Sequence, residues 1–143
     1  MSAATDVAEN AIIDAVIRAQ TPTFPATWTF RIYTAAPGET GGGTEASYTN
    51  YAAATLAASL ANFAGTQSAG STTASSGTGG QTSNNSLLTF GTTAGSGPQT
   101  LTHIAWCNGS TPWFYGALTN TRIINNGDAA PTAAAGSLTL TVA

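Results

Sequence analysis

Residues 101–142 read LTHIAWCNGSTPWFYGALTNTRIINNGDAAPTAAAGSLTLTV, and their pattern decides the predicted fold. Apolar and polar side chains alternate from Leu101 to Cys107, which is the period of a half-buried β-strand. Asn108-Gly109 follows, a residue pair suited to a tight hairpin turn. The stretch therefore predicts an antiparallel β-meander against which most of the hydrophobic core lies. Its further strands are expected at residues 113–118, 121–125 and 137–142, the last two joined across residues 126–128.

Other strand patterns precede this stretch. Residues 27–34 alternate cleanly, with Trp28, Phe30 and Ile32 on one face. The stretch 48–60 is ambiguous: its alanines favour a helix, but its position between β signals favours a strand or two, which is the preferred interpretation. Residues 87–90 resume the strand pattern. The 143 residues are therefore predicted to form one domain, with a β-sandwich over residues 27–143. The expected fold class is mainly β, an antiparallel sandwich of about six to eight strands with one N-terminal α-helix.

The N-terminal segment, residues 5–20, has the pattern of a helix. Asp6 is placed to cap it, with Glu9 at capping-box spacing, and Asp14 and Arg18 are placed for an i,i+4 ion pair. A helix apolar over most of its circumference is normally buried on more than one side. It either covers the open end of its own sandwich or also docks on another protein. The apolar positions are Val7, Ala8, Ala11, Ile12, Ile13, Ala15, Val16, Ile17 and Ala19.

Composition excludes several classes of partner. Only 6% of the residues are charged and the net charge is −3. The few arginines are spread along the chain without a basic patch, so nucleic acid is not an expected partner. The sequence has no pattern of a secretory signal and no apolar run long enough to span a bilayer, so no membrane is expected either. A surface of hydroxyl-bearing and small side chains suits a chain held in a permanent assembly.

Two segments are poor in large side chains. Residues 65–85 are almost entirely Ser, Thr, Gly, Ala, Gln and Asn, and cannot bury enough apolar surface to fold alone. We expect them to form a mobile surface arm or an arm ordered by a neighbouring subunit. The run Gly41-Gly42-Gly43 predicts a loop, and the absence of a following Lys-Ser or Lys-Thr excludes a phosphate-binding loop.

No active site is predicted. His103, the only histidine, lies inside a strand and is expected to bond a hydroxyl or backbone group. Cys107, the only cysteine, shares its strand face, which is ordinary packing rather than a nucleophile and its base. The acids have no spacing that brings two together, so we expect no enzyme, no cofactor and no metal site. The Trp and Tyr residues could form a sugar-stacking face, although core and subunit contacts are their more ordinary role.

Several short motifs carry a family resemblance. They are YTAAPGETGGGTE at residues 33–45, THI at 102–104, YGALT at 115–119, INNGD at 124–128 and G-x-L-x-L at 136–140. With the N-terminal helix, these motifs make nearly the whole chain resemble small virion proteins of tailed phages, described as tail-fibre-like or as capsid decoration (cement) proteins. The resemblance implies no catalytic residues.

The resemblance implies a virion structural protein, made in the host cytoplasm. We expect a cement protein on the outer capsid surface, a homo-oligomer with a trimer favoured, that binds the major capsid protein and stabilises contacts between its subunits. The alternative is a tail-fibre or tail-tip module that binds a host receptor glycan, and an enzyme such as a phage depolymerase is the third. The expected subunit or capsid contacts are Ile13, Ile17, Gly41, Gly42, Gly43 and Arg122.

Overall fold

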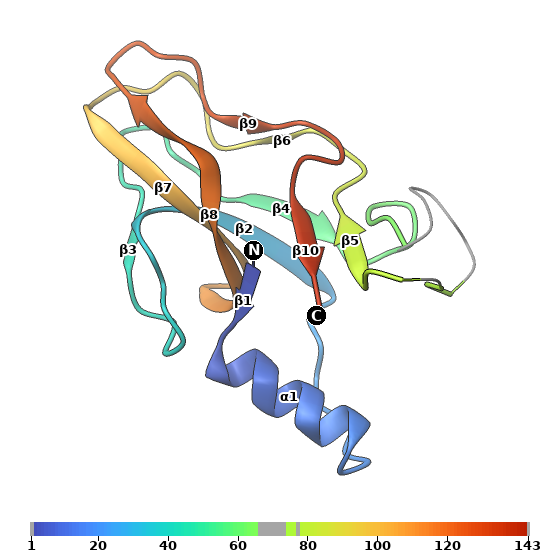
Figure 1. The fold of residues 1–143 in the computed structure, drawn as a ribbon. Coiled ribbons are helices and arrows are strands. Elements are labelled where there is room, and N and C mark those ends of the chain that lie inside the picture. Colours follow the sequence, from blue (N-terminus) through green and yellow to red (C-terminus); the bar gives the residue numbers. More distant parts are fainter. Residues whose placement is uncertain (1, 66–73, 77, 143) are drawn as a thin grey trace.

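A computed structural model describes residues 2–65, 74–76 and 78–142 (Figure 1). Strand accounts for 40% of the chain and helix for 8%, which confirms the mainly β prediction, although the described residues form ten strands rather than six to eight. In chain order the elements are β1 (Ser2–Ala4), α1 (Asp6–Val16), β2 (Thr27–Ala35), β3 (Thr44–Glu45), β4 (Ala54–Ala57), β5 (Gln81–Ser83), β6 (Leu88–Thr89), β7 (Gln99–Asn108), β8 (Thr111–Ile124), β9 (Thr132–Ala133) and β10 (Thr139–Thr141).

The main sheet has six strands, all antiparallel. Its order is β1-β8-β7-β2-β3, and β4 also pairs with β2. Strands β7 and β8 form the predicted hairpin, in which Asn108 pairs with Thr111 and Gly109 adopts a φ of 61°. Glycine suits that left-handed conformation because it has no Cβ to clash. The alternation of apolar and polar residues in the two segments, with the turn-forming pair Asn108-Gly109 between them, was therefore enough to predict the centre of the sheet.

The second layer consists of two separate pairs of strands. Strand β10 pairs with β5, and β9 pairs with β6. The predicted meander is therefore wrong after β8, because the segment expected to continue it crosses over to the other layer (Figure 1). These pairings join residues that are far apart in the sequence, which alternation alone does not predict.

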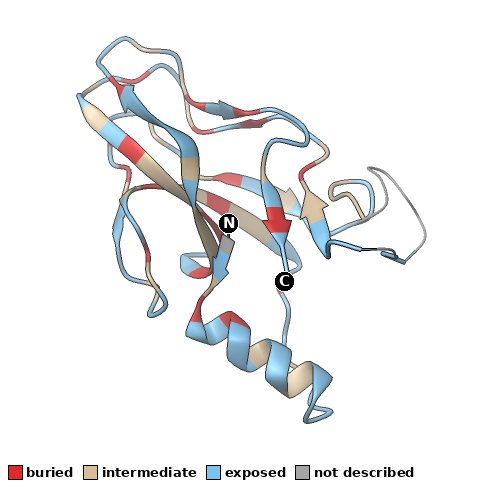
Figure 2. Cartoon of the chain, viewed as in Figure 1, coloured by how far each residue is buried: buried red, intermediate tan, exposed pale blue. Residues whose placement is uncertain are grey.

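The core fills the space between the two layers. Phe30 and Trp106 of the main sheet contribute to it, and Leu88, Phe90 and Leu140 come from the other layer or its connections. Figure 2 shows buried positions in both layers. Burial of large apolar side chains is the main favourable term in folding, so this cluster holds the layers together. Further buried members are Ile32, Ala46, Tyr48, Ala54, Ala94, Leu101, Ile124 and Ala133.

Strand β8 differs from the prediction in being continuous. Residues 113–118 and 121–125 were expected to form separate strands, whereas β8 runs from Thr111 to Ile124. The pairing with β7 changes register within it: Arg122 faces Leu101 and Ala117 faces His103, so the residues 118–121 lie opposite Thr102 alone. A bulge thus absorbs the extra residues without ending the strand.

The other predicted strands are confirmed, with one exception. Residues 27–34 lie in β2, residues 87–90 contain β6, and the alanine-rich stretch contains β4. Tyr48 and Tyr51, by contrast, flank a turn in which Asn50 has a φ of 73°. The Tyr48 hydroxyl donates a hydrogen bond to the carbonyl of Phe90 at 2.8 Å. A buried tyrosine thus satisfies its hydroxyl across the core instead of extending a strand.

The N-terminal helix is shorter than predicted and differently capped. It begins after Thr5, which makes no side-chain capping bond, so the predicted capping box at Asp6 and Glu9 is wrong. Both threonine and aspartate are common capping residues, but the Thr5 hydroxyl is bonded elsewhere. The predicted ion pair is confirmed, with Arg18 Nη1 2.7 Å from Asp14 Oδ1. At 11 residues α1, the one helix in the described part of the chain, is too short to cross a bilayer.

The predicted arm at residues 65–85 is partly wrong. Residues 66–73 and 77 lie outside the described part of the chain. Residues 81–83 form β5, and Asn84 is fully buried. Its side-chain amide donates to the carbonyls of Ser86 and Ala134, each at 2.8 Å, and its Oδ1 accepts from the amide of Leu138 at 2.9 Å. Hydrogen bonds, rather than apolar side chains, therefore fix this end of the arm.

Candidate assembly surface

In the described part of the chain, the two most exposed large apolar side chains lie at the C-terminal end of α1. Ile13 is 49% exposed, Val16 73% and Ile17 76%. Only Ala8 of the helix is buried, so the prediction that the helix is buried on more than one side is wrong within a single chain. Figure 2 shows the helix extending from the end of the sheet with most of its length exposed. We call the exposed set the helix surface; it consists of Val7, Ile12, Ile13, Val16, Ile17 and the neighbouring Phe24.

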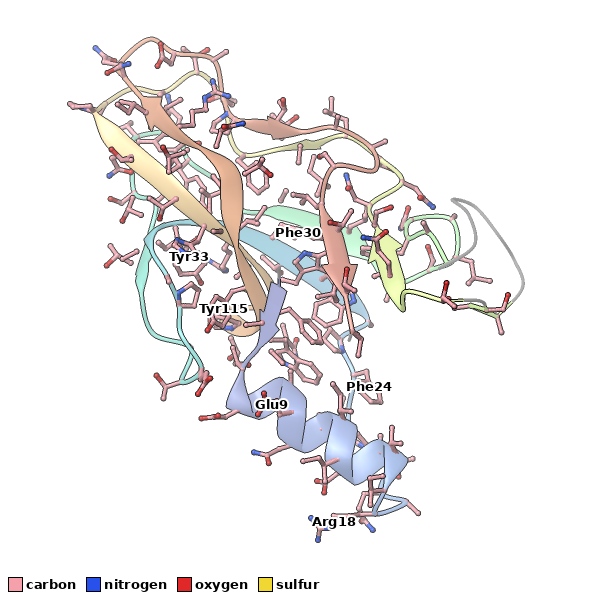
Figure 3. The ribbon with its side chains drawn as sticks, viewed as in Figure 1. Glu9, Arg18, Phe24, Phe30, Tyr33 and Tyr115 are labelled. Atoms are coloured by element: carbon pink, nitrogen blue, oxygen red, sulfur yellow. The ribbon has the colours of Figure 1, made fainter. Side chains whose placement is uncertain are left out.

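The helix is anchored at its N-terminal end. The hydroxyl of Thr5 lies 2.8 Å from the carbonyl of Pro112 and 3.2 Å from that of Trp113. The amide of Asp6 donates to the carbonyl of Glu39 at 3.0 Å. Thr5 is fully buried, so this attachment is well defined. The rest of the helix extends away from it, with Glu9 near the anchored end and Arg18 at the far end (Figure 3).

Phe24 connects the helix surface to the sheet domain. It lies on the segment that returns from α1 to β2, and its ring makes an edge contact with Trp113 at a centroid distance of 6.1 Å. More than half of Phe24 is exposed. The segment between α1 and β2 therefore adds an exposed aromatic ring that contacts the rim of the core.

The glycine run has a structural role. Gly41 and Gly43 adopt φ values of 77° and 89°, and a Cβ on Gly43 would lie 2.6 Å from the carbonyl oxygen of Ala36. Glycine is thus required for the tight connection between β2 and β3. The same connection reaches the base of the helix, where Gly41 lies close to the Pro112 ring. The contact residues predicted at 41–43 are consequently near Thr5, whereas Ile13 and Ile17 lie further along α1.

Arg122 lies apart from the other predicted contacts. It is near the C-terminal end of β8, at the end of the sheet opposite α1 (Figure 1). Its Nη2 donates to the carbonyl of Ala129 at 3.1 Å. The structure therefore does not bring all predicted contact residues to one surface. Contact between these residues and a partner stays a prediction.

The histidine and the cysteine have ordinary structural surroundings. His103 Nδ1 lies 2.8 Å from the hydroxyl of Thr102, which is the hydroxyl partner that the sequence led us to expect. Cys107 is fully buried, and burial raises the pKa of its thiol to about 11. A thiol with a raised pKa holds little thiolate at neutral pH and is a poor nucleophile.

The sequence did not indicate the polar group on the outer side of β2. Arg31 Nη1 lies 2.8 Å from each carboxylate oxygen of Glu45, and its Nε donates to the carbonyl of Gly109 at 3.0 Å. The Tyr51 hydroxyl donates to Glu45 Oε1 at 2.9 Å and accepts from the amide of Ile32 at 3.0 Å. These bonds tie β3, the segment that carries Tyr51 and the β7–β8 turn to β2. No spacing rule joins residues 31, 45 and 109, so only the structure shows the group.

The buried tyrosine hydroxyls and the buried Cys107 thiol should make the fold less stable at high pH. Burial raises the pKa of Tyr33 and Tyr51, and raises that of Cys107 to about 11 from its ordinary value of 9.0. The unfolded chain thus loses these protons at lower pH than the folded chain, so the unfolding free energy should fall as pH rises above about 9. We expect Tyr33→Phe to fall less steeply between pH 9 and 11 than the unmodified chain in urea titrations. Equal slopes for the two proteins would contradict this.

The aromatic residues considered for sugar stacking lie mostly in the core. Trp106 and Trp113 are 5% and 6% exposed, and Trp28 makes edge contacts with both at centroid distances of 6.1 and 5.9 Å. Tyr33 and Tyr48 are also buried. Core packing is therefore the role of these rings, and they do not line up as an exposed platform.

Comparison with known proteins shows the family to which the chain belongs. A small, mainly β domain with an exposed apolar helix is consistent with the resemblance to virion proteins, and the comparison supports a structural protein of a bacteriophage virion. The chain belongs to the family described as Podophage GP4 fiber I protein gp80, whose family model matches residues 3–141. No curated protein matches the chain. The fibre description is closer to the tail-fibre alternative than to the cement interpretation.

Proposed function

We propose that the chain is a structural subunit of a fibre on a podophage particle, that it acts by binding rather than by catalysis, and that the helix surface is its assembly contact. The family match over residues 3–141 carries this proposal. The cement role on the outer capsid surface, with the major capsid protein as partner, has no comparable support. The helix surface favours an assembled subunit over a chain that acts alone.

The physical argument for assembly starts from the length of α1. An isolated helix of this length is marginal in water, because too few hydrogen bonds offset the cost of nucleation. Here the helix spans 11 residues and only Ala8 is buried. Fully burying an isoleucine or valine side chain contributes roughly 1.5–3 kcal/mol. Covering the helix surface would therefore both order α1 and remove an unfavourable exposure to water.

Other copies of this chain are the partners that we propose for the helix surface. Ile12 and Val16 form one i,i+4 pair, and Ile13 and Ile17 form a second pair beside it. The two pairs make an apolar strip broader than the narrow seam of a two-helix contact. In a trimer each helix contacts two neighbours, which such a strip suits. A symmetric homotrimer is therefore the assembly that we propose.

The aromatic residues do not favour a glycan-binding role for this chain. A sugar-stacking surface needs exposed ring faces, whereas Trp106 and Trp113 are buried and Trp28 packs against the core. We therefore assign the chain a scaffolding role within the fibre.

Cryo-electron microscopy of intact particles, combined with quantitative mass spectrometry of their proteins, tests the proposed function. We expect trimeric density for this chain in a fibre, at a small number of positions on the particle. Density repeated over the head lattice would overturn the fibre assignment in favour of a cement protein. Absence of the chain from purified particles would overturn any virion role.

A further inference from the structure

A groove runs between the edge of the main sheet and the second layer. It consists of two adjoining hollows of about 190 and 280 Å³, both lined by Ile104, Leu118, Thr119, Ser137 and Leu138. Three of these shared lining residues are apolar: Ile104, Leu118 and Leu138 are all partly buried and packed against the core. The groove therefore marks the side of the molecule where the two layers leave part of the core uncovered.

Unpaired strand edges flank this groove. Among the described residues, β1 pairs with β8 only from Phe114 to Gly116, so the same edge of β8 has no described partner strand from Ala117 onward. On the opposite side, β5 is the one strand in the described part of the chain that pairs with β10. The β7 ladder is also interrupted at residues 118–121. Within the described residues, the groove is thus bordered by backbone that has room for another strand.

The chemistry of such a groove selects an extended polypeptide. A free strand edge presents backbone donors and acceptors at the repeat of a β-strand, which another strand matches. A segment running antiparallel to β8 would continue the line of β1 from Ala117 towards Ile123. Alternate side chains of that segment would face the apolar lining residues, because successive side chains of a strand point to opposite faces.

One charged residue defines the segment further. Arg122 lines the groove. Arg18 and Arg31 are paired with Asp14 and Glu45, whereas Arg122 has no carboxylate within salt-bridge distance among the described residues. A carboxylate on the incoming segment would complement it.

We propose that this groove binds an extended segment of a different virion protein, with apolar residues at alternate positions and an acidic residue opposite Arg122. The inference rests on the proposed virion function but concerns a surface distinct from α1. A second copy of this chain is a poorer source within the described residues, because residues 18–26, which lie outside its helix and strands, contain Pro22 and Pro25. Proline lacks the backbone N–H that strand pairing needs.

Site-specific photocrosslinking in assembled particles tests the inference. A benzophenone side chain would replace Thr119, an exposed residue that lines the groove, or Thr55, an exposed strand residue that does not. Immunoblotting of purified particles first establishes that the chain is incorporated, so failure of the virion role is seen separately. We expect position 119, and not position 55, to crosslink to a different virion protein at a stretch of alternating apolar residues.

Two variants and a matched control sharpen the test. Leu118→Lys places a charge in the groove, Arg122→Glu reverses the rim charge, and Leu87→Lys makes the same leucine-to-lysine change at an exposed site outside the groove. Crosslinking from position 119 should fall at least tenfold in the two groove variants and stay unchanged in the control. Arg122→Glu keeps the test informative if Leu118→Lys fails to fold.

Several results would overturn the inference. They are a crosslink from position 119 to a second copy of this chain, or no protein crosslink in particles that contain the chain. Amide hydrogen exchange gives an independent reading: residues 117–123 should exchange at least tenfold more slowly in the particle than in the free chain. Equal exchange rates in the particle and in the free chain would exclude a bound strand. The inference would also be overturned if a soluble glycan, and not a protein, protected residues 117–123.

Discussion

Replacing Ile13 and Ile17 together with lysine should convert the proposed oligomer into monomers without unfolding the chain. Both side chains are exposed in the single chain, at 49% and 76%, so the fold loses little by the change. Lysine also has a helix propensity at least as high as isoleucine, so α1 itself should persist. If each lost contact costs about 1.5 kcal/mol or more, association should weaken by roughly 100-fold or more. Sedimentation velocity measures the change in mass.

A single exposed leucine provides the control for this pair. Leu87 is 62% exposed and lies outside the helix surface, so Leu87→Lys should leave the oligomer intact. Circular dichroism spectra and thermal melts of both variants should match those of the unmodified chain. The helix surface is not the assembly contact if the double variant remains oligomeric at the same concentrations, or if particles take it up as well as the unmodified chain.

The second large effect is expected at Asn84. Asn84→Asp keeps the size of the side chain but removes the amide that donates to the carbonyls of Ser86 and Ala134. Two carbonyls lose their donor, and a carboxylate is placed in a fully buried position. An unsatisfied buried polar group costs about 1–3 kcal/mol and an unpaired buried charge costs more. We therefore expect the free energy of unfolding at pH 7 to fall by at least about 3 kcal/mol.

Urea denaturation at two pH values separates the causes at Asn84. At a pH low enough to protonate the new carboxyl, the charge disappears and one donor returns, so part of the stability should be recovered. Asn120→Asp serves as the control, since Asn120 is exposed on β8, and it should change stability by less than about 0.5 kcal/mol. Equal effects of the two substitutions would show that Asn84 does not join the segments of the second layer.

The strands of the main sheet were the most predictable part of the fold. Alternation in residues 27–34 and 101–107 predicted β2 and β7, and Asn108-Gly109 predicted the turn into β8. These features depend on neighbours in the sequence, and the period of a strand is the same wherever the strand lies. The Asp14–Arg18 ion pair was predictable for the same reason, because helical spacing brings those side chains together.

The helix shows where local patterns stop being informative. Its apolar residues predicted burial, yet Val16 and Ile17 are among the most exposed apolar residues of the chain. Periodicity indicates that a face is suited to contact but does not say whether the covering surface belongs to the same chain. The cap failed for a related reason: Thr5 bonds the distant carbonyls of Pro112 and Trp113.

The sequence by itself determined the mainly β class, the β7–β8 hairpin, the N-terminal helix and the absence of a basic patch. Tertiary structure alone decided the pairing of β10 with β5, the burial of Asn84, the Arg31–Glu45 ion pair and the groove beside Leu118. The physical reason is the range of the interactions. Strand period, turn chemistry and helical spacing act between residues a few positions apart, whereas sheet order and burial depend on which distant segments meet across the core.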